Sequence, residues 1–355
     1  MSAFSKKRAQ EILQSQGLQA AVDAYVAHRR QADDQDRQVI ALLAAVCKGA
    51  GADEEERRAA FKKLAASLEP REIGSFMLRV GYRVDFENVA SFKGSLVQRS
   101  RKKQLGCVLP EWQVNDKLKG RRFVEGLGLP VPKVHGTFPM AELPAGDDIV
   151  IKPRDGCGSR GVYILAGGEL FDVRRKEALA SRRELAQRMR RDLEAGKVKR
   201  DLWIVEEFIA GEGEVLNPPA DLKFYCFYGE VRLVLEVTRR PVSQYCWWSG
   251  DGRRVETGKY DDKLFDGQGF GQSELDMAKR LSLDIPAPFL RIDFLKGRDR
   301  VVFGEFTPRP GDYEKFDDRT DRELGEAFLL AEERVQQDLL KGKTFAAYRQ
   351  LIGAR

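Results

Sequence analysis

The chain has 355 residues, which allows two or three packed units with a substantial core, and its net charge of +6 is modest. Five cysteines without a CxxC pair argue against a disulfide framework and a zinc site, and two histidines are too few for a histidine-based triad or metal cluster. No apolar run is long enough to span a bilayer, and the start lacks the apolar stretch of a signal peptide, so we expect a cytoplasmic protein.

The first 70 residues have apolar side chains at helical spacing, as in Leu18, Val22 and Val26. Asp53 is followed by three glutamates, which suit the positive end of a helix dipole. This pattern predicts a small helical bundle. The basic segment that follows at residues 91–103, SFKGSLVQRSRKK, predicts an exposed connection.

Residues 149–162, IVIKPRDGCGSRGV, combine a β-branched run ending in Lys152 with a polar loop that contains three glycines. Glycines let a backbone approach phosphates closely, and the lysine supplies a compact positive charge. The loop lies between two predicted strands and lacks the residue order of a Walker A loop or a dinucleotide-binding motif. Taken alone, such a glycine-rich hairpin is about as often structural as nucleotide-binding.

Residues 174–200 are strongly basic and helical in composition. They form either a solvated outer helix or a surface that attracts an anionic substrate, such as an acidic glycan or a sugar nucleotide. The segment has no interleaved aromatic residues for base stacking, so we expect no nucleic-acid partner.

An apolar strand is predicted at the start of residues 202–214, LWIVEEFIAGEGE, and it runs into Glu206 and Glu207 before an acidic turn. The backbone of such a segment can hydrogen-bond an adenine edge while an acid takes the ribose hydroxyls. Residues 221–237 predict a hairpin in which Asp221 and Lys223 share one face, because they occupy alternate positions. Each segment alone also fits an ordinary strand.

The segment with Tyr245, Trp247 and Trp248 is bounded by Pro241 and by glycines 250 and 252, which predicts a loop. Adjacent tryptophans on a strand would point to opposite faces, so core packing explains one of them more easily than both. Aromatic faces also stack on sugar rings. A place beside the substrate entrance and plain packing are therefore both open.

The last strand-forming runs, FLRIDFL and RVVFGEFT, predict a β-hairpin that brings Asp293 and Glu305 to the same neighbourhood. Mg²⁺ takes oxygen ligands and bridges to phosphate oxygens, so carboxylates on rigid strands suit it. The alternative is a pair of partly exposed acids on an ordinary hairpin.

In their order and spacing these segments, together with NDKLKGRRFVEGLGLPVPKV at residues 115–134, resemble the ATP-grasp superfamily over roughly residues 110–330. The sequences DLKFYCFYGEV, YCWW and GEFTPRPG are most similar to its TupA-like branch, named for teichuronic acid biosynthesis. The resemblance implies an α+β ATP-grasp fold, in which two α+β lobes sandwich ATP, after an N-terminal helical domain. The expected domains are residues 1–105 (helical region and connection), 106–200 (first lobe with the phosphate loop) and 201–355 (second lobe with the metal site and a C-terminal helix).

The resemblance also implies roles for individual residues. ATP would be held by Lys117, Lys152, Gly156, Gly158, Ser159, Gly161, Glu206, Glu207, Ile209, Glu214 and Lys223. Arg291 and Lys223 would act on the transferred phosphoryl group, and Mg²⁺ would be held by Asp293, Glu305 and Thr307. Many family members have asparagine where this chain has Thr307, and a hydroxyl is a weaker ligand than an amide oxygen, which puts a second metal position in doubt.

The activity implied is ATP- and Mg²⁺-dependent ligation of a carboxylate to an amine through an acylphosphate, in cell-surface polysaccharide or peptide-conjugate biosynthesis. The expected partners are small-molecule or glycan carboxylates and amines, anionic ones among them. Two alternatives stay open. One is an ATP-grasp kinase that phosphorylates a hydroxyl, and the other is a nucleotide-binding scaffold protein of polysaccharide assembly, which only Thr307 favours.

Overall fold

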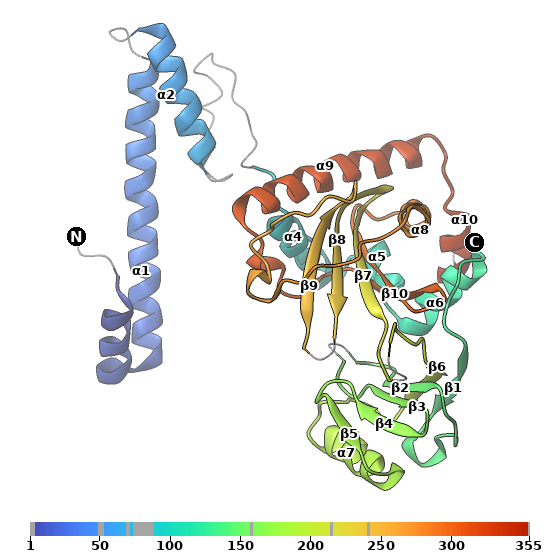
Figure 1. The fold of residues 1–355 in the computed structure, drawn as a ribbon. Coiled ribbons are helices and arrows are strands. Elements are labelled where there is room, and N and C mark those ends of the chain that lie inside the picture. Colours follow the sequence, from blue (N-terminus) through green and yellow to red (C-terminus); the bar gives the residue numbers. More distant parts are fainter. Residues whose placement is uncertain are drawn as a thin grey trace. The chain divides into compact units, whose positions relative to one another are not determined.

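The structure is a computed structural model that describes residues 4–48, 53–68, 72–73, 89–156, 159–213, 216–239 and 242–353. Its contacts divide the chain into two compact units, residues 1–90 and 91–355 (Figure 1). Within the described ranges, no helix combines the length and the apolar character that crossing a membrane requires.

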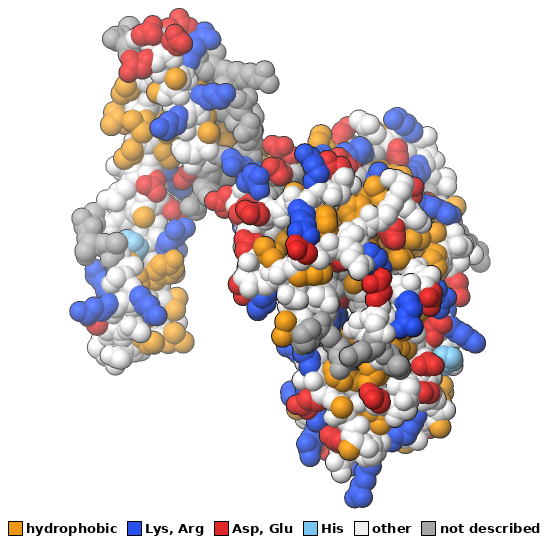
Figure 2. Space-filling view, in the orientation of Figure 1, with side chains coloured by type: hydrophobic (Ala, Val, Ile, Leu, Met, Phe, Trp, Pro, Cys, Tyr) orange, Lys and Arg blue, Asp and Glu red, His pale blue; other side chains and the backbone are white. Residues whose placement is uncertain are grey.

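The N-terminal unit consists of α1 (Lys6–Lys48) and α2 (Glu54–Ser67), which confirms the predicted helical region. Gly17 interrupts α1 with a φ of 87°, a conformation that glycine adopts without steric cost. The ring of Phe4 lies 5.5 Å from that of Tyr25, so the chain reverses at Gly17. A small buried cluster joins the two helices: Ala44, Cys47, Phe61, Ala65 and Leu68. Figure 2 shows further apolar side chains exposed along these helices.

The second unit contains two antiparallel sheets (Figure 1). Sheet A has the order β1-β6-β2-β3-β4-β5 and consists of β1 (Val134–Phe138), β2 (Ile149–Pro153), β3 (Tyr163–Ala166), β4 (Glu169–Asp172), β5 (Glu177–Leu179) and β6 (Trp203–Glu207). Sheet B has the order β11-β10-β7-β8-β9 and consists of β7 (Ala220–Phe227), β8 (Glu230–Thr238), β9 (Gln244–Ser249), β10 (Leu290–Lys296) and β11 (Val301–Thr307).

Helices surround these sheets. They are α4 (Phe92–Gln104), α5 (Pro110–Gln113), α6 (Lys117–Gly126), α7 (Arg182–Glu194), α8 (Gln272–Leu283), α9 (Asp318–Leu340) and α10 (Ala346–Ile352), with short 3-10 turns that include η4 (Asp261–Lys263) and η5 (Tyr313–Lys315). The predicted hairpins at 221–237 and 290–307 are present as β7–β8 and β10–β11.

Alternation along β7 separates the two faces of sheet B. Phe224 and Cys226 face α8, and Cys226 Sγ lies 3.9 Å from the carbonyl oxygen of Ala278. Because successive strand residues point to opposite faces, Lys223 and Tyr225 lie on the other face, which carries the polar groups described below.

Residues 91–103 form α4, so the prediction of an exposed connection is wrong. The Ser91 hydroxyl accepts the N–H of Gly94 and caps the helix, and Phe92 and Leu96 are fully buried. Ser91 Oγ also donates to Asp321 on α9 at 2.7 Å. Of the basic residues that suggested a connection, Lys93 donates to the carbonyl oxygen of Phe316 and Arg99 pairs with buried Glu111, while Arg101, Lys102 and Lys103 lie in the last turn of the helix.

The segment 241–252 is not a loop, because residues 244–249 form β9, the edge strand of sheet B. Trp247 is buried against Tyr225 and Phe316, with ring centroids 5.7 and 5.5 Å away. Trp248 points to the other face, where its Nε1 donates to Glu236 at 3.1 Å. Packing therefore accounts for both tryptophans.

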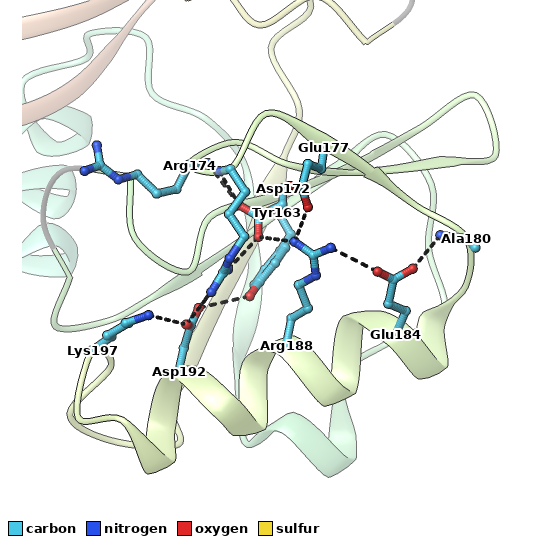
Figure 3. Close-up of polar contacts among 10 residues, drawn as sticks. Tyr163, Asp172, Arg174, Glu177, Ala180, Glu184, Arg188, Asp192 and Lys197 are labelled. Atoms are coloured by element: carbon cyan, nitrogen blue, oxygen red, sulfur yellow. Dashed lines mark hydrogen bonds and ion pairs between the residues drawn. The ribbon is translucent and has the colours of Figure 1, made fainter.

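The basic segment 174–200 is not one continuous helix, because it contains β5 and α7 (Figure 3). Asp172 and Asp192 are buried there, and Arg175 donates to both at 2.7 and 2.8 Å. Arg188 pairs with Glu177 at 2.6 Å. Part of the basic charge is therefore used inside the lobe to attach α7 to sheet A.

Candidate active site

Three charged side chains meet on the polar face of sheet B, on β7 and β10. The register places Lys223 opposite Asp293, and Lys223 Nζ donates to Asp293 Oδ2 at 2.7 Å. Arg291 lies two residues earlier on the same face and donates from Nε and Nη2 to the two carboxylate oxygens, each at 2.7 Å. Bidentate, charge-assisted hydrogen bonds of this kind fix geometry as well as charge. The two strands thus hold two cations on one carboxylate.

Asp293 is 2% exposed, so its charge depends on these partners. Burial raises the pKa of this carboxyl, but the positive charges of Arg291 and Lys223 outweigh burial and bring its pKa below the ordinary value. Burial lowers the pKa of Arg291, and the negative charge of Asp293 more than reverses that effect. Asp293 therefore stays ionised at neutral pH.

The charged cluster continues from sheet B to the phosphate loop of the first lobe. Lys223 Nζ also lies 3.3 Å from Asp221 Oδ1. Asp221 accepts from Arg239 Nε at 2.7 Å, and Arg239 Nη1 lies 3.3 Å from the hydroxyl of Ser159. A chain of hydrogen bonds thus links the loop after β2 to the residues predicted to meet the transferred phosphate.

A pocket where sheet A meets β11 brings together the residues predicted to bind the nucleotide. Lys117, Lys152 and Glu206 line it beside Phe303 and Gly304. Lys152 Nζ pairs with Glu206 Oε1 at 2.5 Å, and Lys117 Nζ donates to the carbonyl oxygen of Pro153 at 3.1 Å. With Arg121, three cations, one acid and an aromatic ring therefore share a narrow pocket between the lobes.

The phosphate loop joins β2 to β3, as predicted. Gly161 has a φ of 69°, and a Cβ there would lie 3.1 Å from Val198 and 3.2 Å from Trp203, so the turn requires glycine. Gly156 packs so closely on Pro153 that a Cβ would lie 2.6 Å from its ring. Gly158 lies outside the described residues.

The residues predicted for adenine and ribose take several positions. Glu207 ends β6, pairs with Arg300 of the β10–β11 turn at 2.6 Å and accepts the backbone N–H of Lys133 at 2.8 Å. Ile209 is buried beneath the same turn, next to Gly297. Glu214 lies outside the described residues. The structure therefore places Glu207 and Ile209 at the junction of the lobes.

The predicted metal ligands lie on neighbouring strands. Asp293 pairs with Glu305 in the β10–β11 register, and Glu305 is exposed without a hydrogen-bonding or ion-pair partner among the described residues. Thr307 Oγ1 accepts from Arg291 Nη2 at 3.0 Å. Among the described residues, no three His, Cys, Asp or Glu side chains gather as a metal cluster. Two hard carboxylates beside a phosphate site still fit a Mg²⁺ that takes its other ligands from phosphate and water.

Two residues of this region were not predicted as site residues. The Tyr225 hydroxyl is buried without a hydrogen-bond partner among the described residues, and burial raises its pKa to about 12 although Arg291 opposes the shift. Lys259 is 1% exposed behind the same aromatic residues. No local pattern marks them, because their environment comes from contacts between distant segments.

Comparison with solved structures gives matches among ATP-grasp ligases. A D-alanine–D-alanine ligase from Bacillus anthracis complexed with ATP is 13% identical with a TM-score of 0.40, over 70% of this chain and 76% of that one. The D-cycloserine synthetase DcsG is 19% identical with a TM-score of 0.38, over 68% and 79%. The ATP-grasp ligase PsnB complexed with a minimal precursor is 14% identical with a TM-score of 0.35, over 67% and 72%. No curated protein matches the chain.

A family model described as TupA-like ATPgrasp matches residues 95–329, about two-thirds of the chain. The match contains both sheets and every predicted site residue. It begins inside α4 and leaves out the N-terminal unit. The chain belongs to the TupA-like ATP-grasp family and has the ATP-grasp fold.

Proposed function

We propose that the chain is an ATP- and Mg²⁺-dependent ligase that joins a carboxylate to an amine through an acylphosphate. The observation that carries the proposal is the contact of Lys223 and Arg291 with Asp293, next to Glu305. It combines cations for a transferred phosphoryl group with carboxylates for a metal. We propose that Lys117, Lys152 and Glu206, which line a hollow of about 10 Å³, surround part of the nucleotide.

Each side chain has a proposed role that follows from its position. Lys117 and Lys152 would hold the α- and β-phosphates, and Lys223 would hold the γ-phosphate. When bound at Asp293 and Glu305, Mg²⁺ would neutralise phosphate charge. Arg291 would stabilise the negative charge that develops on the transferred group, and such preorganised donors are the largest source of rate enhancement in many enzymes. We propose that Thr307 also helps to hold the ion, because its hydroxyl lies beside Arg291.

The reaction has two displacements. A carboxylate oxygen of the donor attacks the γ-phosphorus, the bond to the bridging oxygen breaks, and ADP leaves. The amine then attacks the acyl carbon, and phosphate leaves with its electron pair. We propose anionic donors such as uronic acids, in polysaccharide or peptide-conjugate assembly, because Arg183, Arg190 and Arg191 remain exposed on α7.

The test is ADP release by the full chain with ATP and Mg²⁺ against pooled uronic acids and amino acids, with amino acids and amino sugars as amines. Hydroxylamine is added in parallel, because it converts an acylphosphate into a hydroxamate. The ligase gives carboxylate-dependent ADP release, a hydroxamate and an amide. A kinase gives a phosphorylated acceptor and no hydroxamate, and that result would overturn the proposal. Lys223→Met should abolish the signal, and Lys341→Met, on the exposed end of α9, should not.

A further inference from the structure

A groove lies along the edge strand β9, next to the charged cluster of sheet B. Two hollows that share Tyr245, Asp262 and Lys263 form it. We call it the β9 groove. Its walls come from β9, from the segment around η4, from the loop after β11 and from the β4–β5 turn of the first lobe. Its charged side chains are Lys176, Asp261, Asp262, Lys263, Asp312 and Lys315.

Strand register places this groove close to the charged cluster. Tyr245 pairs with Val237 on β8, and Val237 pairs with Asp221 on β7, so the three residues form one row across the sheet. Neighbouring strands are about 4.8 Å apart, which puts Tyr245 about 10 Å from Asp221. Asp312 follows β11, the strand that carries Glu305. A molecule in the groove would therefore lie about 10 Å from Asp221, on the face of sheet B that carries Lys223 and Arg291.

The backbone of the groove is strained at two contacting residues. Tyr260 has a φ of 68° and Asp312 a φ of 53°, in the left-handed region that non-glycine residues rarely adopt. The Tyr260 hydroxyl donates to Asp312 Oδ2 at 3.1 Å, and its ring stacks on Tyr245 with centroids 4.1 Å apart. Strain of this kind gathers at ligand clamps and active sites. The fold thus fixes the position of the Asp312 carboxylate in the groove.

A buried lysine supports the same loop from behind. Lys259 Nζ donates to the carbonyl oxygen of Gly311 at 2.7 Å and lies over the ring of Phe316, 4.8 Å from its centroid. No carboxylate pairs with it in the part of the chain that the structure describes. Lysines are almost never fully buried without such a partner. A buried hydrogen-bond donor therefore fixes the backbone immediately before Asp312.

The charges of the groove differ from one end to the other. The hollow at the β11 loop has three aspartates, at 261, 262 and 312, against Lys263 and Lys315, which leaves one negative charge in excess. Lys315 Nζ lies 3.4 Å from Asp312 Oδ1 and Lys263 Nζ lies 3.6 Å from Asp262 Oδ2, and all four side chains are exposed enough to take a further partner. The hollow at the β4–β5 turn has Lys176 and Lys263 against Asp262, which leaves one positive charge in excess. The groove is thus polarised, with its acidic end toward the loop that follows the metal-site strand.

We propose that the β9 groove is the acceptor subsite and that it takes a free α-amino acid, with the ammonium at Asp312 and the carboxylate toward Lys263 and Lys176. The proposal rests on the ligase function proposed above. A zwitterion matches both ends of the groove, whereas an amino sugar or a simple amine matches only the acidic end. After losing a proton, the amine nitrogen forms the new C–N bond as the bond from the acyl carbon to phosphate breaks. One further proton leaves the nitrogen, so that one proton ends on the released phosphate and one in solvent.

The experiment measures binding without turnover. The full chain with Mg²⁺ and a non-hydrolysable ATP analogue is screened by saturation-transfer NMR against pooled D- and L-α-amino acids, and hits are titrated calorimetrically. Each hit is compared with the amine that lacks its carboxylate and with its N-acetyl derivative. We expect both changes to weaken binding at least tenfold.

Variants locate the site. Asp312→Asn keeps a residue that accepts the left-handed conformation, and Lys263→Met keeps the length of the side chain. Each should weaken amino-acid binding at least tenfold, while the matched changes Asp276→Asn on α8 and Lys341→Met on α9 should leave it within twofold. If circular dichroism shows that Asp312→Asn is misfolded, Tyr260→Phe replaces it, because it removes the donor to Asp312 and keeps the ring. A weakening of about threefold or more is then expected.

The outcomes separate this inference from the proposed function. It is overturned if no amino acid binds, if the carboxylate-free amines bind equally well, or if the variants retain full affinity. If amino acids bind in a way that depends on Asp312 and Lys263 but no ADP or amide is formed, the subsite is supported and the proposed ligase function is refuted. If an amide forms and both the Asp312 and the Lys263 variant keep an unchanged KM for the amine, the ligase function is supported and the proposed subsite is refuted.

Discussion

The first lobe and sheet B each contain a buried cluster of carboxylates and cations, and the two clusters differ in how completely they are satisfied. In the first lobe, Asp172 and Asp192 are enclosed by Arg175 and Arg188, and Tyr163 donates to Asp192 at 3.4 Å (Figure 3). Burial, followed by the nearby carboxylates, raises the pKa of Tyr163. Each of these charged and polar side chains has a hydrogen-bonding or ion-pair partner within the cluster, as in a network that attaches a helix to a sheet.

The cluster of sheet B leaves groups with unused bonding capacity. Glu305 has no partner among the described residues, the Tyr225 hydroxyl is buried and unpaired there, and Lys259 makes one hydrogen bond although an ammonium has three donors. Burying polar groups without partners costs free energy, so a fold retains them mainly where they serve another purpose. A buried ion network alone therefore does not indicate a site, and incomplete satisfaction is the informative difference.

Removing a member of the first cluster should give the largest effect, and on stability alone. Asp192→Ala removes one of the two buried carboxylates that Arg175 binds and leaves the Tyr163 hydroxyl without its acceptor, while Asp172 still pairs with Arg175, and we expect a loss of about 3 kcal/mol in the free energy of unfolding. ATP affinity, measured by calorimetry on the folded variant, should stay within twofold. A large loss of ATP affinity at unchanged stability would contradict the division between the clusters.

The opposite result is expected in sheet B. Glu305→Gln keeps the shape of an exposed side chain and removes one negative charge from the metal site, so Mg²⁺-dependent ADP release should fall about 10²–10³-fold. The free energy of unfolding should change by less than about 0.5 kcal/mol. Glu326→Gln on α9 is the matched control and should leave both quantities unchanged. Equal activity in the two variants would remove Glu305 from the metal site.

Lys152 is predicted to bind the phosphates of ATP, so its loss should act on ATP binding. Lys152→Ala should raise the dissociation constant of ATP at least tenfold, because a cation at the phosphates is lost. The fold should survive, with some loss of stability from the unpaired Glu206. Lys133→Ala, an exposed lysine just before β1, provides the comparison in the same titration. An unchanged ATP affinity in the folded Lys152 variant would refute the assignment.

Lys259 should make stability depend on pH. Burial, reinforced by Arg291, lowers its pKa to about 7, although Asp312 and Glu314 oppose the shift. Between pH 7 and the ordinary lysine pKa the unfolded chain binds more protons than the native one, so this group makes the protein more stable as pH rises through that window and less stable as pH falls toward 7.

Lys259→Met should remove that slope, which is at most about 1.4 kcal/mol per pH unit. Urea unfolding of the two proteins at pH 6.5, 8 and 9.5 gives the comparison. Parallel curves over this range would show that Lys259 titrates as an exposed lysine does.

The smallest effect is expected at Thr307. An asparagine there supplies a stronger oxygen ligand, so Thr307→Asn should preserve the fold and leave the Mg²⁺ concentration for half-maximal ADP release equal or lower. The residue is only half-buried, and its one side-chain hydrogen bond to a described residue comes from Arg291. An unfolded Thr307→Asn protein would show that the position is packed and does not face the site.

Sequence reasoning predicted the strands that carry Lys152, Lys223 and Asp293, because runs of apolar, strand-forming residues lie there and polar or glycine-containing turns separate them. It could not predict the link from Ser159 through Arg239 to Asp221, which joins segments 80 and 18 residues apart. Side-chain partners of this kind depend on how the two sheets pack.

Two local errors have the same origin. The basic residues of α4 led to the prediction of an exposed connection although Phe92 and Leu96 are buried, and the glycines after Trp248 led to the prediction of a loop where the edge strand β9 lies. In both segments local composition suggested exposure, and tertiary packing decided otherwise. Lys259 gave no sequence signal, because its neighbours Gly311 and Phe316 lie more than 50 residues away.

The division of the chain at residue 90 has a consequence for spectroscopy. The four tryptophans, at positions 112, 203, 247 and 248, all belong to the unit of residues 91–355, and the N-terminal unit has none. Tryptophan fluorescence is therefore silent about α1 and α2, whereas far-ultraviolet circular dichroism detects their helices. When both signals are followed during one denaturant titration, coincident transitions would mean that the two units unfold together. Separate transitions would give each unit a stability of its own without cutting the chain.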